Sequence, residues 1–302
     1  MEVISLKQLS LFFVLVLVIA TPLFAQQSDG GLRTELRLNG WMFENFFQSS
    51  DPATEEDVSA LGAELRIAGG SRTGWSPYAR ANYLKYDDEG LDSTYGGRVG
   101  LALDSNPHSF DAHADHQLDR PTFDIGDVFD RADVTTVGAE YRYRITRNWE
   151  AGVEGQYQQQ GFQELTIKDN EYTGYGASLR YRGFGSLFSP EVGFMMGERE
   201  VDDPTETYDQ DETYIQVRSA PSAAVYLSLR YRMREREYTT VDALASNFGR
   251  TDDRNQWTFS ADWRLSPRFA LNGYYSDETS DSSREGRDFD TKLYMVGVTV
   301  GF

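Results

Sequence analysis

The chain of 302 residues contains no cysteine and carries a formal net charge of -19. The lack of cysteine excludes disulfides, thiolate metal sites and cysteine nucleophiles. The negative charge argues against nucleic acid as a partner, because binding to phosphates needs clustered lysine and arginine. Hydrophobic residues make up 39% of the chain, which excludes a bundle of membrane helices beyond the N-terminus, since each helix needs about 20 mostly apolar residues.

The N-terminus has the pattern of a secretory signal peptide. Lys7 precedes an apolar run over residues 9–20, and Ala25 ends a short region suited to cleavage. The alternative is an uncleaved anchor, which we disfavour because the apolar run is short for a spanning helix. The sequence therefore predicts a signal peptide over residues 1–25 and a single β domain over residues 26–302.

Beyond the signal peptide, short segments alternate apolar and polar residues, which is the period of a strand with one apolar face. In chain order the predicted strands cover about residues 32–42, 61–67, 78–86, 95–104, 110–115, 137–145, 149–157, 174–182, 192–196, 214–218, 225–234, 257–265, 269–275 and 290–302. The strand over residues 78–86 is the least clear, since either parity could form its apolar face. About fourteen strands are thus predicted.

The predicted connections alternate between short and long. Residues 105–109, 146–148, 219–222 and 266–268 form tight turns, whereas residues 117–133, 198–212, 235–253 and 277–290 form long polar loops. An even number of antiparallel strands, with short turns at one end and long loops at the other, is typical of a bacterial transmembrane barrel. In that arrangement both termini and the short turns lie in the periplasm, and the long acidic loops are extracellular.

The last predicted strand, over residues 290–302, also favours a closed barrel. Its apolar face consists of Tyr294, Val296, Val298, Val300 and Phe302. These alternate with small or polar residues, so the strand has one face suited to lipid and one suited to a wet lumen. A terminal strand left unpaired would invite aggregation, whereas a strand that closes a barrel has no free edge. A soluble β-sandwich is the alternative, which we disfavour because the opposed faces hold too many charges for a dry core.

The inward faces of these strands carry a charged pattern. The residues predicted to line the pore are Arg33, Glu35, Arg37, Glu64, Arg66, Arg98, Asp111, His113, Asp115, Glu140, Arg142, Arg144, Glu150, Glu154, Arg180, Arg182, Arg218, Arg230, Arg232, Asp262 and Arg264. Glu191 also has the inward parity. Such rows form cross-strand ion pairs. They act either as an electrostatic filter for solutes or as a structural ladder in the wall, and both roles are compatible.

Glycines and acidic residues suggest two further features. Inward glycines such as Gly96, Gly138, Gly193 and Gly297 leave room in the lumen, although each glycine alone is better explained by a bend or bulge.

The long segments over residues 118–133, 198–212 and 277–290 carry most of the net negative charge. Their acidic residues serve solubility or attract cations. The loop over residues 235–253 is the least polar and is the best candidate to fold into the lumen.

One group of residues has the composition of a possible catalytic or metal site. Asp111, His113 and Asp115 share one face of one strand, where a histidine flanked by carboxylates could act as a general base or join a metal site. A single strand cannot wrap a metal, and no matching nucleophile is evident. We therefore interpret His113 as part of the lumen network and predict no catalytic site, metal or cofactor.

The signal peptide, the alternating connections and the final Val298-Thr299-Val300-Gly301-Phe302 together resemble a bacterial outer-membrane β-barrel, similar in size to the monomeric fourteen-stranded porins. The resemblance covers essentially all of residues 26–302 and implies residence in outer-membrane lipid and a monomeric state. It also implies recognition of the C-terminal aromatic residue by the barrel-assembly machinery. The resulting hypotheses are a passive pore for small hydrophilic solutes, a scaffold barrel that houses a partner protein, and a barrel enzyme using His113.

Overall fold

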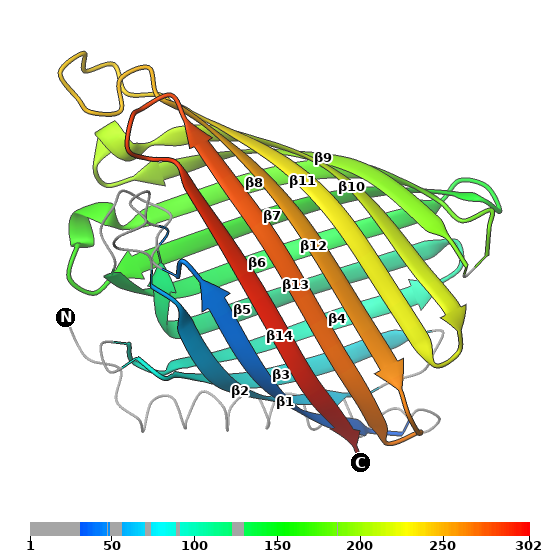
Figure 1. Ribbon diagram of the computed structural model, residues 1–302. Coiled ribbons are helices and arrows are strands. Elements are labelled where there is room, and N and C mark those ends of the chain that lie inside the picture. The colour runs from blue at the N-terminus through cyan, green and yellow to red at the C-terminus, as the bar shows by residue number, and fades with distance from the viewer. Residues whose placement is uncertain are drawn as a thin grey trace.

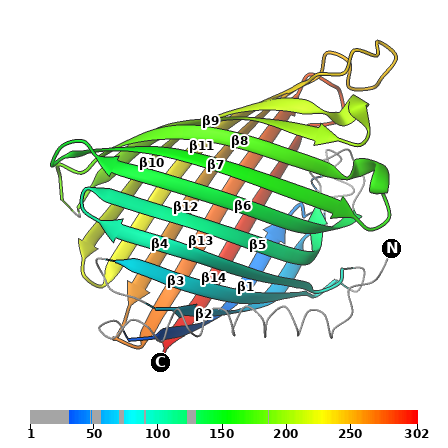
Figure 2. The same ribbon diagram turned by 180° about the vertical axis from the view of Figure 1, so that it is seen from behind.

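The computed structural model describes residues 31–46, 48, 56–69, 74–88, 91–122, 130–185 and 187–302. Within these residues, fourteen strands form one closed antiparallel barrel (Figures 1 and 2). Each strand pairs with its neighbours in the sequence, and the last strand pairs with the first. The fold therefore confirms the predicted architecture and strand number. The predicted signal peptide lies outside the described residues.

The elements follow one another in simple up-and-down order. They are β1 (Arg33–Glu44), β2 (Val58–Ala68), β3 (Trp75–Tyr86), β4 (Thr94–Ser105), β5 (His108–Thr122), β6 (Asp130–Arg144), β7 (Trp149–Phe162), η1 (Thr166–Lys168), β8 (Asn170–Tyr181), β9 (Ser189–Val201), η2 (Pro204–Glu206), β10 (Tyr208–Ser222), β11 (Val225–Tyr238), β12 (Thr251–Arg264), β13 (Phe269–Ser282) and β14 (Phe289–Gly301). In the described part of the chain, no helix is long and apolar enough to cross a membrane.

The two ends of the sheet meet along a full strand. The β1–β14 ladder runs from the Glu35–Gly301 pair to the Glu44–Lys292 pair without a break. The backbone N–H of Phe302 extends it by donating to the Thr34 carbonyl at 2.9 Å. Closure satisfies the backbone groups that an open sheet would leave unpaired, which hydrocarbon does not tolerate.

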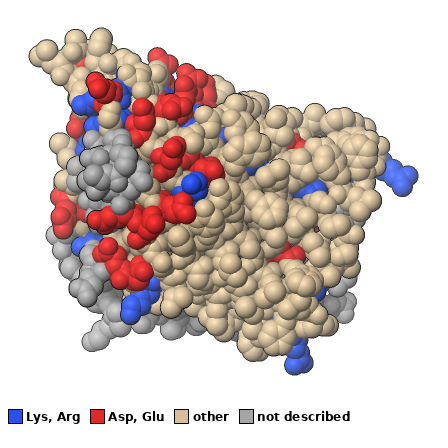
Figure 3. All heavy atoms as spheres, in the orientation of Figure 1, with Lys and Arg blue, Asp and Glu red and all other residues tan. Residues whose placement is uncertain are grey.

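Side chains alternate between an apolar outer face and a polar inner face. On β14, Tyr294, Val296, Val298 and the terminal Phe302 are exposed, whereas the alternating Met295 and Gly297 are buried. Figure 3 shows the same segregation on one face of the molecule: acidic side chains gather over the end with the loops, and a band almost free of charge crosses the strands. The exposed apolar side chains therefore form a band on the outer surface of the barrel and not a core inside it.

The structure settles the orientation of β3, which the sequence left open. Tyr78, Arg80 and Asn82 point inward, as shown by the contacts of Tyr78 with Asp111 and of Arg80 with Glu64. Trp75 and Tyr83 are exposed on the outer face. The sequence was ambiguous because both faces of this strand contain aromatic residues.

The strands at the loop end are longer than predicted. Long parts of the segments predicted as loops continue the strands. In the described part of these segments, the connections cover only residues 202–207, 239–250 and 283–288. Backbone pairing does not depend on side-chain polarity, so the ladder continues where both faces have become polar and the apolar alternation has ended. The predicted strand ends at this side of the barrel were therefore wrong.

The β11–β12 connection over residues 239–250 projects away from the barrel end (Figure 1). Val241 and Leu244 are almost fully exposed, and Asn247 anchors the connection by donating to the Thr205 carbonyl at 3.1 Å. Residues 239–250, in the segment that the sequence singled out as the candidate to fold into the lumen, therefore lie outside it. The apolar residues of this segment made it the least polar of the long loops. The contact that anchors it is made with the neighbouring β9–β10 connection.

Apolar packing inside the barrel is confined to two small clusters near the loop end. One contains Phe46, Val58 and Tyr86, packed against Trp41 and Phe43. The other contains Ala132, Val134, Phe162 and Val201, which come from β6, β7 and β9. Across the rest of the described inner wall the side chains are mostly polar or charged, and there the candidate site lies.

Candidate functional site

All residues predicted to line the pore have the inward parity of their strands, opposite to the exposed apolar rows. The structure brings many of them together. Glu140, Arg142, Glu150, Arg180, Arg182 and Arg218 join one network on β6–β10; Arg230 and Arg232 join a second on β10–β12; Glu64, Arg98 and Asp115 join a third on β2–β5. Asp111 and His113 form a cluster of their own, and the predicted residues outside the three networks are Arg33, Glu35, Arg37, Arg66, Arg144, Glu154, Asp262 and Arg264.

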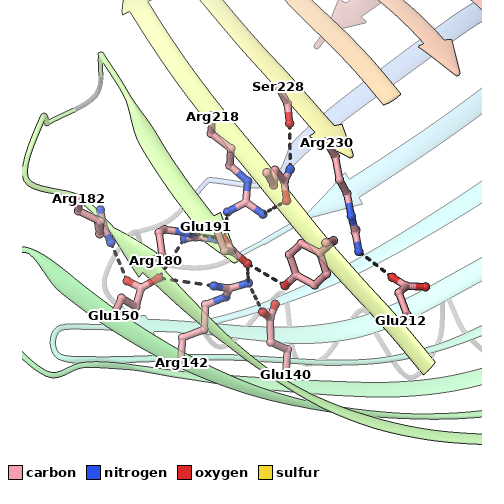
Figure 4. A network of polar contacts seen from close by, with 12 residues as sticks. Glu140, Arg142, Glu150, Arg180, Arg182, Glu191, Glu212, Arg218, Ser228 and Arg230 are labelled. Atoms are coloured by element: carbon pink, nitrogen blue, oxygen red, sulfur yellow. Dashed lines mark hydrogen bonds and ion pairs between the residues drawn. The ribbon is translucent and has the colours of Figure 1, made fainter. Parts of the chain in front are cut away.

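Glu191 on β9 is the centre of the first network (Figure 4). Its Oε1 accepts hydrogen bonds from Arg142 Nη2 and the Tyr214 hydroxyl, each at 3.0 Å. Its Oε2 accepts from Arg180 Nε and Arg218 Nη1, each at 2.7 Å. Three guanidinium groups from three strands thus surround one carboxylate whose side chain is only 1% exposed. Charge-assisted bonds of this length are the strong class, and a carboxylate so enclosed is fully satisfied.

Glu150 on β7 continues the network toward the short turns. Arg180 Nη1 donates to Oε1 at 2.9 Å, and Arg182 Nη1 donates to Oε2 at 2.8 Å. Arg142 Nη1 lies 3.8 Å from Oε1, and the same guanidinium contacts Glu140. Arg142 therefore connects three carboxylates, and Arg180 connects two.

Glu212 on β10 forms the centre of the second network. It pairs with Arg230 at 3.0 Å and with Arg232 at 3.4 Å, and Arg232 also donates to Gln256. The Arg230 guanidinium lies 4.0 Å from the centre of the Tyr214 ring, which is a cation–π distance. Tyr214 thus joins the two networks, since its hydroxyl donates to Glu191.

Exposure separates the two signs of charge in these networks. The side chains of Glu191, Glu150 and Glu212 are 1%, 7% and 8% exposed. Among their partners, Arg182, Arg230 and Arg218 are 42%, 35% and 26% exposed, whereas Arg142 and Arg180 are 11% and 17% exposed. The carboxylates therefore lie against the wall and the guanidinium groups lie over them, facing the lumen. In these two networks the more exposed charges are therefore mainly positive.

The third network repeats this order on the inner face of β2–β5. Asp115 is almost fully buried and pairs with Arg98 at 3.1 Å and Arg80 at 3.9 Å, and both arginines are partly exposed. Arg80 also pairs with Glu64 at 3.4 Å. Glu140 and Asp111 differ from the pattern, because each is more exposed than its basic partner.

His113 belongs to a small cluster beside this network. Its Nδ1 lies 3.1 Å from Asp111 Oδ1, and the Tyr78 hydroxyl donates to the same carboxylate at 3.2 Å. Asp115 points to Arg98 and Gln117 instead, so Asp111, His113 and Asp115, which share one face of β5, do not all contact the imidazole. No group of three or more metal-ligating side chains occurs among the residues that the structure describes.

Sequence reasoning missed four members of these networks: Tyr78, Arg80, Glu212 and Tyr214. The first two lie on the strand of uncertain parity. Glu212 was assigned to a loop, although Glu212, Tyr214, Gln216 and Arg218 continue one alternating inward row in β10. That row of two-residue steps is the signal that could have found them.

Several inward glycines have a role other than leaving room in the lumen or forming a bend or bulge, which were the two interpretations of the sequence. A Cβ atom on Gly193 would lie 2.4 Å from the Tyr214 ring, and one on Gly100 would lie 2.3 Å from the Tyr78 ring. A Cβ on Gly138 would meet the His113 ring at 2.9 Å. These glycines therefore let rings from neighbouring strands lie flat on the wall, which covers the glycine backbone and keeps the rings out of the lumen.

Comparison with known proteins agrees with this architecture. A family model described as Gram-negative porin matches residues 108–283. Outer-membrane expressed OmpT of Vibrio cholerae has a TM-score of 0.50 and 8% identity, covering 90% of this chain and 97% of that chain. OpdK of Pseudomonas aeruginosa, solved with vanillate, has a TM-score of 0.48 and 11% identity, covering 91% and 100%. An anion-selective porin from Comamonas acidovorans has a TM-score of 0.47 and 10% identity, covering 91% and 100%. At 8% identity the likeness to OmpT shows the fold alone. No curated protein matches the chain in sequence.

Proposed function

Because the chain belongs to the Gram-negative porin family, it is an outer-membrane pore for small solutes, and we propose that its lumen favours anions. The observation that carries this proposal is the order of charge on the inner wall. Glu150, Glu191 and Glu212 are buried beneath guanidinium groups that are several times more exposed. Charged side chains that line a pore set its ion preference, and here the exposed charge is positive.

The buried carboxylates have a structural part in this proposal. Each oxygen of Glu191 and Glu150 accepts at least one hydrogen bond from an arginine, so the long arginine side chains are held along the wall. The carboxylates also offset the mutual repulsion of the arginines. The ladder and filter roles predicted from the sequence are thus two aspects of one network, in which acids position bases.

We place the short turns and both termini in the periplasm, with the connections between β9–β10 and β11–β12 outside the cell. The support is the general rule for outer-membrane barrels, in which short turns face the periplasm. Under this orientation the acid-rich end in Figure 3 faces the exterior. The arginine networks then lie between that entrance and the periplasm.

We also propose that the barrel is a channel without enzymatic activity. His113 contacts Asp111, and within the described residues we find no nucleophile arranged beside it. Replacement of His113 by alanine should leave any hydrolysis of phospholipid or peptide in the purified sample unchanged. A loss of hydrolysis in this variant would support the enzyme hypothesis instead.

The anion preference is testable in planar lipid bilayers. With a KCl gradient across the membrane, the zero-current potential of the purified protein should have the sign of chloride permeation. The double variant Arg218→Gln, Arg230→Gln should lower the chloride-to-potassium permeability ratio by about fivefold or more, since each unit charge met at about 4 Å in water contributes about 1 kcal/mol.

The matched control is Arg268→Gln, which removes an exposed arginine from the β12–β13 turn and should leave the ratio unchanged. A wild-type potential of the opposite sign would overturn the proposed preference. A barrel that carries no current and co-purifies with another protein would support the scaffold hypothesis in place of the pore.

A further inference from the structure

A cavity at the short-turn end of the barrel borders the first network and shares Arg142, Glu150, Arg180 and Arg182 with it. It has a volume of about 190 Å³ and lies between the β4–β5 turn and the ends of β6, β7 and β8. Its charged lining consists of Arg142, Arg144, Arg180, Arg182, Glu150 and Asp104. Four guanidinium groups therefore face one small space that contains two carboxylates.

Both oxygens of the Glu150 carboxylate in this lining already accept hydrogen bonds. Arg180 and Arg182 donate to its two oxygens at 2.9 and 2.8 Å, and its side chain is 7% exposed. A guanidinium group has five N–H donors, so the contacts of Arg142 and Arg180 with Glu191, and of Arg142 with Glu140, still leave N–H groups of the four arginines without a carboxylate. The cavity thus retains hydrogen-bond donors and positive charge.

Two specific donors in this lining lack acceptors. Arg142 Nη1 and Arg144 Nε are buried and have no hydrogen-bond partner among the described residues. Arg144 is nevertheless held in place, because its Nη1 donates to Asn106 Oδ1 at 2.9 Å across the β4–β5 turn. Buried donors without acceptors are costly, and such groups in a folded protein call for an explanation.

We propose that this cavity binds a small oxyanion, such as a phosphate or a carboxylate group. Planar guanidinium groups pair with such anions through two parallel hydrogen bonds, which a spherical chloride ion cannot accept in the same way. The volume is below the range of about 300–1,000 Å³ typical of drug-sized ligands, which suits one anionic group and not a large solute. The inference rests on the proposed anion preference and adds a saturable site near one mouth of the pore.

Single-channel conductance in sodium phosphate at pH 7 tests the site. In the wild type we expect conductance to saturate with phosphate concentration, while in KCl it follows the conductivity of the solution. In Arg182→Gln the phosphate concentration at half-saturation should rise about fivefold, because a charge-assisted hydrogen bond at a partly exposed position is lost. The control Arg147→Gln removes an exposed arginine from the β6–β7 turn at the same end, outside the cavity lining, and should behave as the wild type.

The outcomes separate this inference from the proposed function. If phosphate conductance does not saturate, or if both variants shift the half-saturation equally, the oxyanion site is wrong even when the zero-current potential in KCl shows anion preference. If that potential shows cation preference, the proposed function is wrong whatever phosphate does. Saturation that weakens only in Arg182→Gln supports the site.

Discussion

The Tyr214 side chain shows how a single residue can organise the lumen wall. Its ring lies over Gly193 of β9, where a Cβ atom would come within 2.4 Å of it. Its hydroxyl donates to Glu191 at 3.0 Å, and Arg230 lies over its ring at 4.0 Å. Because Gly193 has no side chain, the Tyr214 ring can lie over it, and in this position Tyr214 contacts both charged networks.

Replacement of Gly193 by alanine should displace Tyr214 and lower the free energy of unfolding by about 1–3 kcal/mol, the usual cost of an overpacked site. Urea titration of the barrel in detergent micelles, followed by tryptophan fluorescence, would measure the change. Gly273→Ala is the matched control, because a Cβ at that outward glycine would meet no atom within 4 Å. Equal stability of the two variants would contradict this account of Tyr214.

At the scale of the element, β14 combines closure of the sheet with exposure of an apolar row. Its register with both β1 and β13 is continuous, so its side chains keep strict alternation between the two faces. Val296 in the middle of the strand is 73% exposed. In a membrane that face contacts hydrocarbon, which stabilises a valine and penalises a charge.

Val296→Arg should therefore destabilise the folded barrel in lipid vesicles by about 2–4 kcal/mol, the cost of an arginine facing lipid near the bilayer midplane. Phe302→Arg places the same charge at the end of the chain, where we expect a cost of about 0–1 kcal/mol because the interface is polar. Folding titrations monitored by gel mobility would measure both. A larger cost at position 302 than at position 296 would argue against a lipid-facing β14.

At the scale of the whole molecule, charge is divided between two places. Acidic side chains gather at the end of the barrel with the longer connections (Figure 3), whereas the exposed charge of the inner-wall networks is mainly positive. An anion that enters from the acidic end meets repulsion before attraction. The net charge of -19 thus does not by itself predict cation preference.

This division predicts an unusual dependence on salt. The exposed acids are screened strongly when the Debye length falls from about 10 Å at 0.1 M to about 3 Å at 1 M, and the partly buried arginines are screened less. The chloride-to-potassium permeability ratio should therefore rise between KCl gradients centred near 0.1 M and near 1 M. A ratio that falls over this interval would show that the acidic end has little influence on permeation.

Local patterns were sufficient to predict the kind of fold. Alternation with a period of two residues gave the strands and their faces, including the inward row from Glu140 to Arg144 and the outward row that ends at Phe302. Even strand number and alternating connections then favoured closure, because an open sheet would leave both edges unpaired. These features depend on neighbouring residues, so the sequence alone determined them.

Only the tertiary structure decided which charges meet and which of them face the lumen. Arg142 on β6 reaches Glu191 on β9, a residue on a strand that does not adjoin its own. Such contacts depend on the relative register of several strands and on the length of the side chains, and neither leaves a local pattern. The burial of Glu191 beneath three arginines, the flat position of Tyr214 on Gly193 and the cavity beside Arg182 arise from the same cause: they are properties of a curved wall in which distant segments share one surface.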